Sequence, residues 1–291
     1  MSAINGAAVQ TRESFIRKHP LPAFFALAIG LTWIFLITDA LGSHGILPFR
    51  LPLPLLILTG YMPTLAAVIV QRATKGGRGV KDLFRKLLIW RVGIGWYAFA
   101  IFGFAIICPA VVVIYNLLGV GPALPILSAK TMSLSGPALI PSILLLFVVT
   151  GIVNGEELAW RGFALPRLQA KYNALQSSLI LGVPWTVFHI PLFFTTTGSS
   201  QANMSFLSFL VMTLGLTVLY TWVFNHTRGS VLLAYLFHAS ANTWTQVFTV
   251  DHTNATLDWI MAGVIVLLAV AVVGIAGSEN LSRSTRRIQE A

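Results

Sequence analysis

Long apolar segments, separated by short polar intervals, follow one another along almost the whole chain. Each segment holds about 20 mostly apolar residues, which is the length that an α-helix needs to cross the hydrocarbon core of a bilayer. The intervals carry turn residues such as the pair Gly76-Gly77 and the run from Gly119 to Pro122. The pattern therefore predicts eight membrane-spanning helices, at residues 21–42, 51–71, 94–119, 136–164, 175–196, 204–225, 229–249 and 257–276.

The basic residues fall on one side of this arrangement. With the N-terminus placed in the cytoplasm, every Lys and Arg except Arg50 and Lys130 belongs to a segment on the cytoplasmic side. Such an asymmetry sets the orientation of membrane proteins, and leaving out any one span would destroy it. We therefore predict an all-α membrane protein, an eight-transmembrane-helix bundle with both termini cytoplasmic.

The long basic interval between the second and third spans, residues 72–93, has a pattern of its own. Apolar residues recur there at helical spacing between basic ones, at positions 80, 83, 84, 87 and 88. This spacing is typical of an amphipathic helix that lies on a membrane surface. We expect such a helix in this interval.

The composition agrees with a membrane protein. The 291 residues are 56% hydrophobic and only 10% charged, with a mean hydropathy of +0.80, whereas soluble domains carry about 25% charged residues. The net charge of +10 does not indicate nucleic-acid binding, because the basic residues lie at the ends of apolar spans and form no basic face with interleaved aromatics. We expect membrane lipids as partners and no nucleic acid.

A few ionisable residues lie within the predicted spans, where they are costly. On insertion scales an Asp, Glu or Arg at the bilayer centre costs about 2.5–3.5 kcal/mol, whereas a Leu returns only about 0.3–0.6 kcal/mol. Such residues are tolerated where they face the bundle interior, pair with each other or reach water, so each one indicates a candidate functional site. The residues concerned are Asp39, Glu156, Glu157, Arg161, His189 and His238.

The segment 155–163, Gly-Glu-Glu-Leu-Ala-Trp-Arg-Gly-Phe, holds three of them. Glu157 and Arg161 are four residues apart, so they share a helix face and can pair. Glu156 is turned about 100° from Glu157 around the helix and does not share that partner. We therefore expect a structural ion pair between Glu157 and Arg161, with Glu156 facing another helix or water.

Three further polar residues lie on other spans. His189 belongs to the fifth span, and His238 and Asn242 lie on one face of the seventh, four residues apart. Any one of them alone could simply pack or join helices through hydrogen bonds. Together with Glu156 they could activate water and stabilise an oxyanion. Glu156, His189 and His238 could equally bind a divalent metal such as zinc, with a position left for water.

Three short motifs carry a resemblance to a known family. Glu-Glu-Leu-Ala-Trp-Arg (156–161) fits E-E-x-x-x-R, and His-Ala-Ser-Ala-Asn (238–242) fits H-x-x-x-N. Residues 185–189 resemble F-x-x-x-H, with Trp185 where that motif has Phe. Their order along successive spans resembles the CAAX-protease and bacteriocin-processing family. That family consists of intramembrane endopeptidases, including the type II prenyl-protein endopeptidase and the bacterial abortive-infection proteins.

The resemblance implies a role for each motif residue. Glu156 would be the general base that activates water, assisted by His189. His238 and Asn242 would form the oxyanion hole, or His238 would hold a metal with Glu156 and His189. Glu157 and Arg161 would orient the site. The sequence contains no H-E-x-x-H, which excludes a zincin-type helix.

The resemblance also implies an activity. The chain would be a peptidase, glutamate-type or metal-dependent, that cuts near the C-terminus of a membrane-associated protein or peptide, of which prenylated CAAX chains are one case. For Glu156 to reach the histidines, we expect the fourth span to continue past Trp160 toward Pro166. A water-filled cavity would then open on the cytoplasmic side of what we expect to be a bacterial cell membrane.

Two other functions compete with this interpretation. A non-catalytic membrane adaptor or a bacteriocin self-immunity protein would keep the polar residues for packing, and Glu156→Gln would then leave its function intact. A proton-coupled transporter could use Glu and His as relays, but it would show broken helices at matching positions of two inverted halves. Pro184 and Pro191 of the fifth span have no such counterparts.

We therefore divide the chain into three parts. Residues 1–20 form a cytoplasmic N-terminal tail, and residues 21–277 form a single transmembrane bundle with its catalytic core at 150–245. Residues 278–291 form a cytoplasmic C-terminal tail, which its short polar sequence predicts to be mobile.

Overall fold

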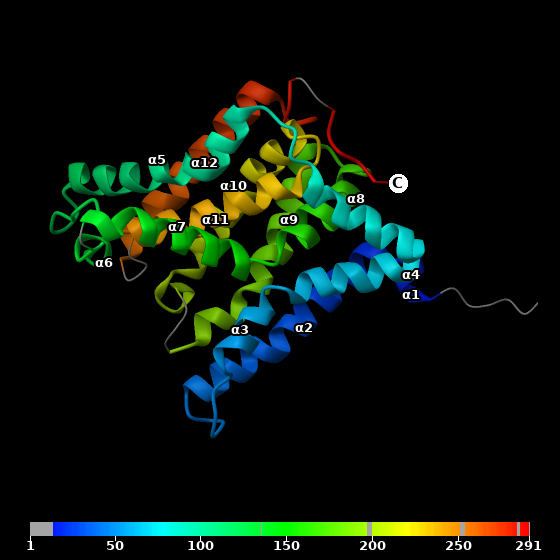
Figure 1. The fold of residues 1–291 in the computed structure, drawn as a ribbon, viewed down its shortest axis with the longest axis horizontal. Coiled ribbons are helices and arrows are strands. Elements are labelled where there is room, and N and C mark those ends of the chain that lie inside the picture. The colour runs from blue at the N-terminus through cyan, green and yellow to red at the C-terminus, as the bar shows by residue number, and fades with distance from the viewer. Residues whose placement is uncertain (1–13, 135, 197–199, 251–253, 284–285, 291) are drawn as a thin grey trace, which may run out of the picture.

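The computed structural model describes residues 14–134, 136–196, 200–250, 254–283 and 286–290. These residues form helices and connecting segments, with no β-strand among them (Figure 1). Most of the predicted N-terminal tail lies outside the described residues. The α-helices are α1 (Phe15–Lys18), α2 (Pro20–Ser43), α3 (Leu53–Thr59), α4 (Met62–Arg85), α5 (Ile94–Leu118), α6 (Ala129–Met132), α7 (Gly136–Val153), α8 (Leu165–Gln169), α9 (Ala174–Phe188), α10 (Phe206–His226), α11 (Val231–Val247) and α12 (Ala255–Ala276). A π-helix, η2 (Leu158–Ala164), and three 3₁₀-helices, η1 (Lys86–Leu88), η3 (Ile190–Phe194) and η4 (Ser200–Asn203), complete the described elements.

The helices confirm an all-α architecture with several candidate membrane spans. Within the described residues six helices are long and apolar enough to cross a membrane, namely α2, α5, α7, α9 extended through η3, α10 and α12. The pair α3 and α4, bent by 49°, would make a seventh. Helix α11, at 17 residues, is shorter than these spans. The count of eight spans and the cytoplasmic position of both termini therefore stay predictions.

Helices α10 and α11 run through the middle of the bundle, with α5 and α12 on one side and α2 and α4 on the other (Figure 1). Helix α10 is mostly buried, whereas α7 buries Thr150 alone. Large apolar side chains of α7, such as Ile140 and Leu145, are exposed. Because lipid tails solvate such side chains as well as a protein core does, this surface suits a bilayer.

Several polar side chains of the bundle are paired with each other. Thr150 on α7 lies 2.8 Å from the hydroxyl of Thr243 on α11. Asp39, near the end of α2, forms an ion pair with Arg50 at 2.8 Å. Hydrogen bonds of this kind join helices in an apolar surrounding, where an unpaired polar group would be costly.

The prediction of one continuous helix over residues 136–164 is wrong. Helix α7 ends at Val153, residues 154–156 form a turn, and the chain resumes as η2. Thr64 donates its hydroxyl to the Gly155 carbonyl at 2.6 Å, and Tyr61 donates to the Ile152 carbonyl. These hydroxyls, from the start of α4, satisfy carbonyl groups that the interrupted helix leaves without a helical donor.

Two glycines let the chain segments approach closely at this turn. A Cβ on Gly155 would lie 2.3 Å from the Tyr61 ring, and a Cβ on Gly60 would lie 2.5 Å from the Val153 carbonyl oxygen. The bend between α3 and α4 therefore packs directly against the break after α7. This contact determines where Glu156 lies.

The predicted amphipathic helix corresponds to the second half of α4. Helix α4 is interrupted at Gly76, whose φ of 67° lies in the left-handed region that glycine adopts without a steric penalty. Beyond this point Leu83 is buried, whereas Phe84 is exposed. The segment is thus a helix with one buried face, as its spacing predicts.

The C-terminal segment packs against α8, contrary to the mobile tail that its composition predicts. The backbone N–H of Glu290 donates to the Pro166 carbonyl at 3.1 Å. The Gln169 amide donates to the Ile288 carbonyl at 2.7 Å, and Arg287 donates to the Gln169 carbonyl at 3.0 Å. The end of the chain accordingly lies beside α8 (Figure 1).

Candidate active site

Glu156 lies in the turn between α7 and η2 and is 6% exposed. Its Oε2 accepts two hydrogen bonds from indole N–H groups, both at 2.9 Å, from Trp160 on η2 and from Trp185 on α9. The other oxygen, Oε1, is bound to no residue that the structure describes and is not enclosed. The carboxylate is therefore held in one orientation by Oε2, with Oε1 left to meet water or a substrate.

Glu157 is fully buried beside it and has two partners. Its Oε1 accepts from Arg161 Nη1 at 3.0 Å, which confirms the predicted ion pair. The same oxygen lies 2.8 Å from Nδ1 of His238. Glu157 therefore contacts His238 in addition to its predicted partner Arg161. Glu157 joins η2 to α11 because its side chain points between the two helices.

Arg161 lies on η2 with no exposed side-chain surface. Its guanidinium carbon is 3.9 Å from the centroid of the Tyr220 ring and 4.3 Å from that of Trp185. A desolvated cation over an aromatic face gains about 2 kcal/mol. These two rings compensate for the hydrogen bonds that Arg161 Nε and Nη2 do not make within the described residues.

His238 presents one ring nitrogen to the site. An ionised carboxylate only accepts hydrogen bonds, so we assign the donor role in the contact with Glu157 to Nδ1 of His238. The Nε2 atom on the other side of the ring remains available. The ring centroid lies 5.9 Å from that of Trp185 and 6.0 Å from that of Tyr220, at steep angles to both.

His189 ends α9 and has a similar arrangement. Its Nδ1 lies 2.7 Å from the Trp185 carbonyl oxygen, which can only accept, so Nδ1 donates here too. The ring packs edge-on against Phe188 and Phe209, with centroids 4.7 and 5.2 Å away. The Nε2 of a half-buried imidazole is again left for a ligand.

Trp185 connects the predicted site residues. Its indole N–H binds Glu156, its ring lies under Arg161, and its ring centroid is 6.1 Å from that of His189 and 5.9 Å from that of His238. The structure thus gathers the predicted carboxylate and both imidazoles around one indole. In the sequence Trp185 is only a departure from a motif, and Trp160 was not predicted as a site residue. The available signal was spacing, since Trp160 follows Glu156 by four residues.

Asn242 lies one turn beyond His238 on α11 and is half-buried. Its carbonyl accepts from the Gln246 amide at 2.8 Å. Its side-chain amide makes no hydrogen bond with the described part of the chain. The structure therefore places Asn242 near His238 by helical spacing and does not link it directly to Glu156 or His189.

Glu156, His189 and His238 do not form a ready-made set of three metal ligands among the described residues. No group of three His, Cys, Asp or Glu residues within the described ranges is placed to hold an ion. Glu156 Oε1 and the Nε2 atoms of His189 and His238 are the atoms that would have to converge on an ion, because Oε2 and each Nδ1 are engaged with protein atoms. Metal binding by these residues therefore stays a prediction.

An apolar cavity of about 390 Å³ lies between α2 and η3. Its wall includes Trp33, Ile37 and Leu41 on α2 and His44 directly after this helix. Ile190 and Pro191, which directly follow His189, also line it. We predicted a water-filled cavity at the site, but the cavity that adjoins His189 is lined mainly by apolar side chains. It suits an apolar group better than a polar one.

Sequence comparison agrees with the geometry. Residues 136–244, which contain every predicted site residue, match the family described as type II CAAX prenyl endopeptidase Rce1-like. The matched segment of the chain is thus similar to the CAAX-protease family. Over 133 residues it is 28% identical to CAAX prenyl protease 2 of Methanococcus maripaludis, covering 44% of this chain and 48% of that protein. The chain thus matches about half the length of this relative. The family model describes endopeptidases, and the apolar helices of this chain fit a multi-pass membrane protein.

Proposed function

We propose that this protein is an intramembrane endopeptidase that hydrolyses a peptide bond near the C-terminus of a membrane-associated protein or peptide. The observation that carries the proposal is Glu156, a buried carboxylate whose Oε2 is held by two indole donors while Oε1 is unengaged. A general base needs this combination of fixed geometry and one available lone pair.

In the proposed reaction, Glu156 Oε1 takes a proton from water as the oxygen attacks the peptide carbonyl carbon. The resulting tetrahedral oxyanion collapses, the C–N bond breaks, and Glu156 returns the proton to the leaving nitrogen. His189 would orient the water by accepting a hydrogen bond at Nε2 from the O–H that the water keeps. The indoles of Trp160 and Trp185 keep the carboxylate directed toward the water throughout.

The oxyanion would be stabilised from α11. The Asn242 amide can donate an N–H, and His238 in its imidazolium form can donate from Nε2 while Glu157 accepts from Nδ1. Donors fixed in a water-poor site stabilise developing charge more than they would in water. The role of Glu157 and Arg161 is to position His238, because neither side chain is exposed to a substrate.

The substrate would carry an apolar group beside the scissile bond. The cavity between α2 and η3 is next to His189 and could take a lipid or an apolar side chain, including the prenyl group of a CAAX-type substrate. The asymmetry of the basic residues favours a site that opens toward the cytoplasmic side of the cell membrane, which we take to be bacterial.

The test is cleavage of a panel of C-terminal peptides, unmodified and farnesylated, by the purified full chain in detergent. Glu156→Gln should lower kcat by about 10²–10⁴, the usual contribution of a general base, and His189→Ala and His238→Ala should also lower it. Asp82→Asn, a carboxylate-to-amide change at an exposed position of α4, is the matched control. Full cleavage by Glu156→Gln would refute the proposal.

The same assay, repeated with a chelator, separates the two versions of the chemistry. Unchanged cleavage supports Glu156 acting on water directly. Loss of cleavage that added Zn²⁺ restores would favour the metal-dependent version, with Glu156, His189 and His238 rearranging to bind the ion.

A further inference from the structure

A second cavity, of about 490 Å³, lies where α1, the start of α2, the middle of α4 before Gly76, and α8 meet. Its wall brings together five basic side chains from three segments of the chain. These are Arg17 and Lys18 before α2, Lys75 on α4, and Arg167 and Lys171 at and after α8. Glu290 is the acidic residue in the wall among the described residues.

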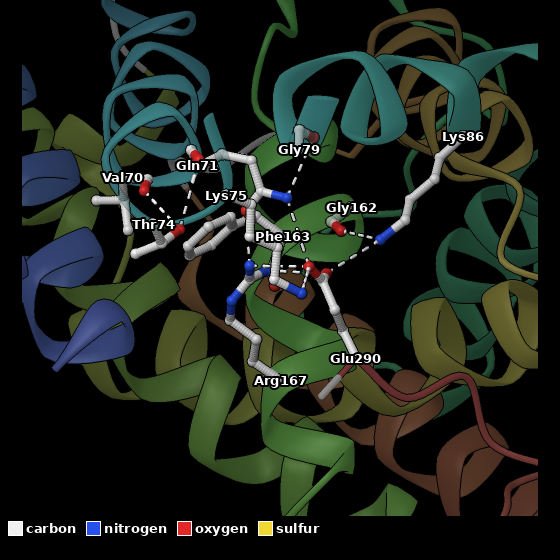
Figure 2. A network of polar contacts seen from close by, with 10 residues as sticks. All are labelled: Val70, Gln71, Thr74, Lys75, Gly79, Lys86, Gly162, Phe163, Arg167 and Glu290. Atoms are coloured by element: carbon white, nitrogen blue, oxygen red, sulfur yellow. Dashed lines mark hydrogen bonds and ion pairs between the residues drawn. The ribbon is translucent and has the colours of Figure 1, made fainter. Parts of the chain in front are cut away.

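The carboxylate of Glu290 already forms ion pairs with several cations (Figure 2). Its Oε1 lies 3.1 Å from Lys75 Nζ, and its two oxygens each accept a hydrogen bond of 2.9 Å from Arg167. Lys86, behind the cavity wall, lies 3.6 Å from Oε2. One negative charge is thus shared by three positive charges and cannot neutralise all of them.

The remaining cations of the wall have no acidic partner among the residues that the structure describes. Lys18 and Lys171 form no ion pair with any residue in the described ranges, and Arg17 donates to the backbone carbonyl of Ala73 at 3.0 Å. The cavity therefore has a strongly positive wall with a single, shared carboxylate. Such a concentration of like charge favours an anion.

The opposite part of the wall is apolar and belongs to a candidate membrane span. Pro20, Leu21 and Pro22 line the cavity, and Pro20 begins α2. A basic cluster directly outside a membrane span lies at the level of the lipid headgroups. We propose that this cavity binds the phosphate of an anionic membrane lipid, with the acyl chains running along the first turns of α2.

The cavity is separate from the candidate active site. Three buried aromatic rings lie between the cavity and the site. The ring centroid of Phe24 is 5.5 Å from that of Trp160 and 4.9 Å from that of Phe163. Arg167 in turn lies over the other face of this cluster, 3.8 Å from the Phe163 ring centroid. The lipid site therefore does not depend on the proposed peptidase activity.

The experiment measures lipid binding to the full chain by native mass spectrometry, with phosphatidylglycerol and phosphatidylcholine as probes. The test variant is Lys18→Gln with Lys171→Gln, which removes two lining cations outside the Glu290 network. The matched control is Arg78→Gln with Lys81→Gln, two exposed cations of α4 that do not line the cavity. All four side chains are exposed, so folding is not at risk.

We expect the wild type to bind phosphatidylglycerol more tightly than phosphatidylcholine. The test variant should weaken phosphatidylglycerol binding about tenfold or more, since each basic residue near a membrane surface contributes about 1 kcal/mol. The affinity of the control variant for phosphatidylglycerol should stay within about twofold of the wild-type value. Equal loss in the two variants, or equal binding of the two lipids, would overturn the proposal.

Competition with inorganic phosphate shows whether the cavity binds the phosphate of a lipid or free phosphate. Displacement of phosphatidylglycerol only by a large excess of phosphate supports a lipid, because the acyl chains add affinity along α2. Displacement at equal concentrations would show a site for free phosphate and would overturn the lipid assignment.

Discussion

The indole N–H of Trp185 donates a 2.9 Å hydrogen bond to Oε2 of Glu156, joining α9 to the turn after α7. The family motif that the sequence resembles has Phe at this position, and Phe cannot make this bond. In this chain, therefore, the orientation of the proposed general base depends on a donor that the motif itself does not supply.

Trp185→Phe restores the motif residue and removes the donor. A hydrogen bond to a charged group is worth about 1.5–3 kcal/mol, so we expect kcat to fall about tenfold to a hundredfold with KM little changed. Trp244→Phe, which removes an indole donor to the Ile101 carbonyl away from the site, should leave kcat unchanged. Equal kcat for Trp185→Phe and wild type would show that the bond does not orient Glu156.

Arg161→Met leaves the buried Glu157 carboxylate without its guanidinium partner. We expect a loss of about 3–5 kcal/mol in the free energy of unfolding, as for other broken buried pairs. Adding Glu157→Gln should recover part of this loss, because the unpaired charge is then gone. Denaturant titrations in detergent measure both variants, and failure of the double variant to recover would mean that packing on Tyr220 and Trp185 dominates.

Gly155→Ala places a methyl group 2.3 Å from the Tyr61 ring. We expect a stability loss of about 1–3 kcal/mol, typical of overpacking, and reduced kcat because Glu156 follows directly. Gly274→Ala on α12, where a Cβ would meet nothing within 4 Å, is the control and should be neutral or stabilising. Thermal unfolding and peptide cleavage together check this prediction.

Glu290 should make stability depend on pH. Burial raises the pKa of Glu290, but the charges of Arg167, Lys86 and Lys75 outweigh it and hold the pKa below its usual value. A carboxyl group with a lowered folded-state pKa stabilises the fold above its unfolded pKa of about 4.3 and loses that contribution as the pH falls through the folded value.

Glu290→Gln should therefore lower the Tm at pH 7, and the difference from wild type should shrink as the pH falls below about 4.3. Glu279→Gln, at a side chain that is 65% exposed, should show a smaller effect at pH 7. A Tm difference for Glu290→Gln that does not change with pH would point to packing rather than charge.

Leu41→Phe should narrow the apolar cavity beside His189. If this cavity takes the apolar group of the substrate, KM for a farnesylated peptide should rise several-fold while KM for its unmodified counterpart stays constant. Ile34→Phe, at an exposed position of the same helix, is the control. A parallel rise for both peptides would show that the cavity does not receive the lipid.

Local patterns in the sequence were enough to predict most of the long apolar helices, the ion pair between Glu157 and Arg161, and the resemblance to the CAAX-protease family. A segment of about 20 apolar residues is recognised as a candidate membrane span from its length and hydropathy alone. A pair four residues apart needs only one turn of helix to meet. The motif residues, from Glu156 to Asn242, likewise follow from short spacings along single helices.

Only the tertiary structure decided how these parts meet. Tyr61 and Thr64 interrupt the predicted helix after α7 from about 90 positions away in the sequence. His238 turns to Glu157 rather than to Glu156, and Glu290 reaches across to Arg167. Contacts of this kind depend on how helices pack, and hydrophobic periodicity specifies which face of a helix is apolar without specifying which neighbour it meets.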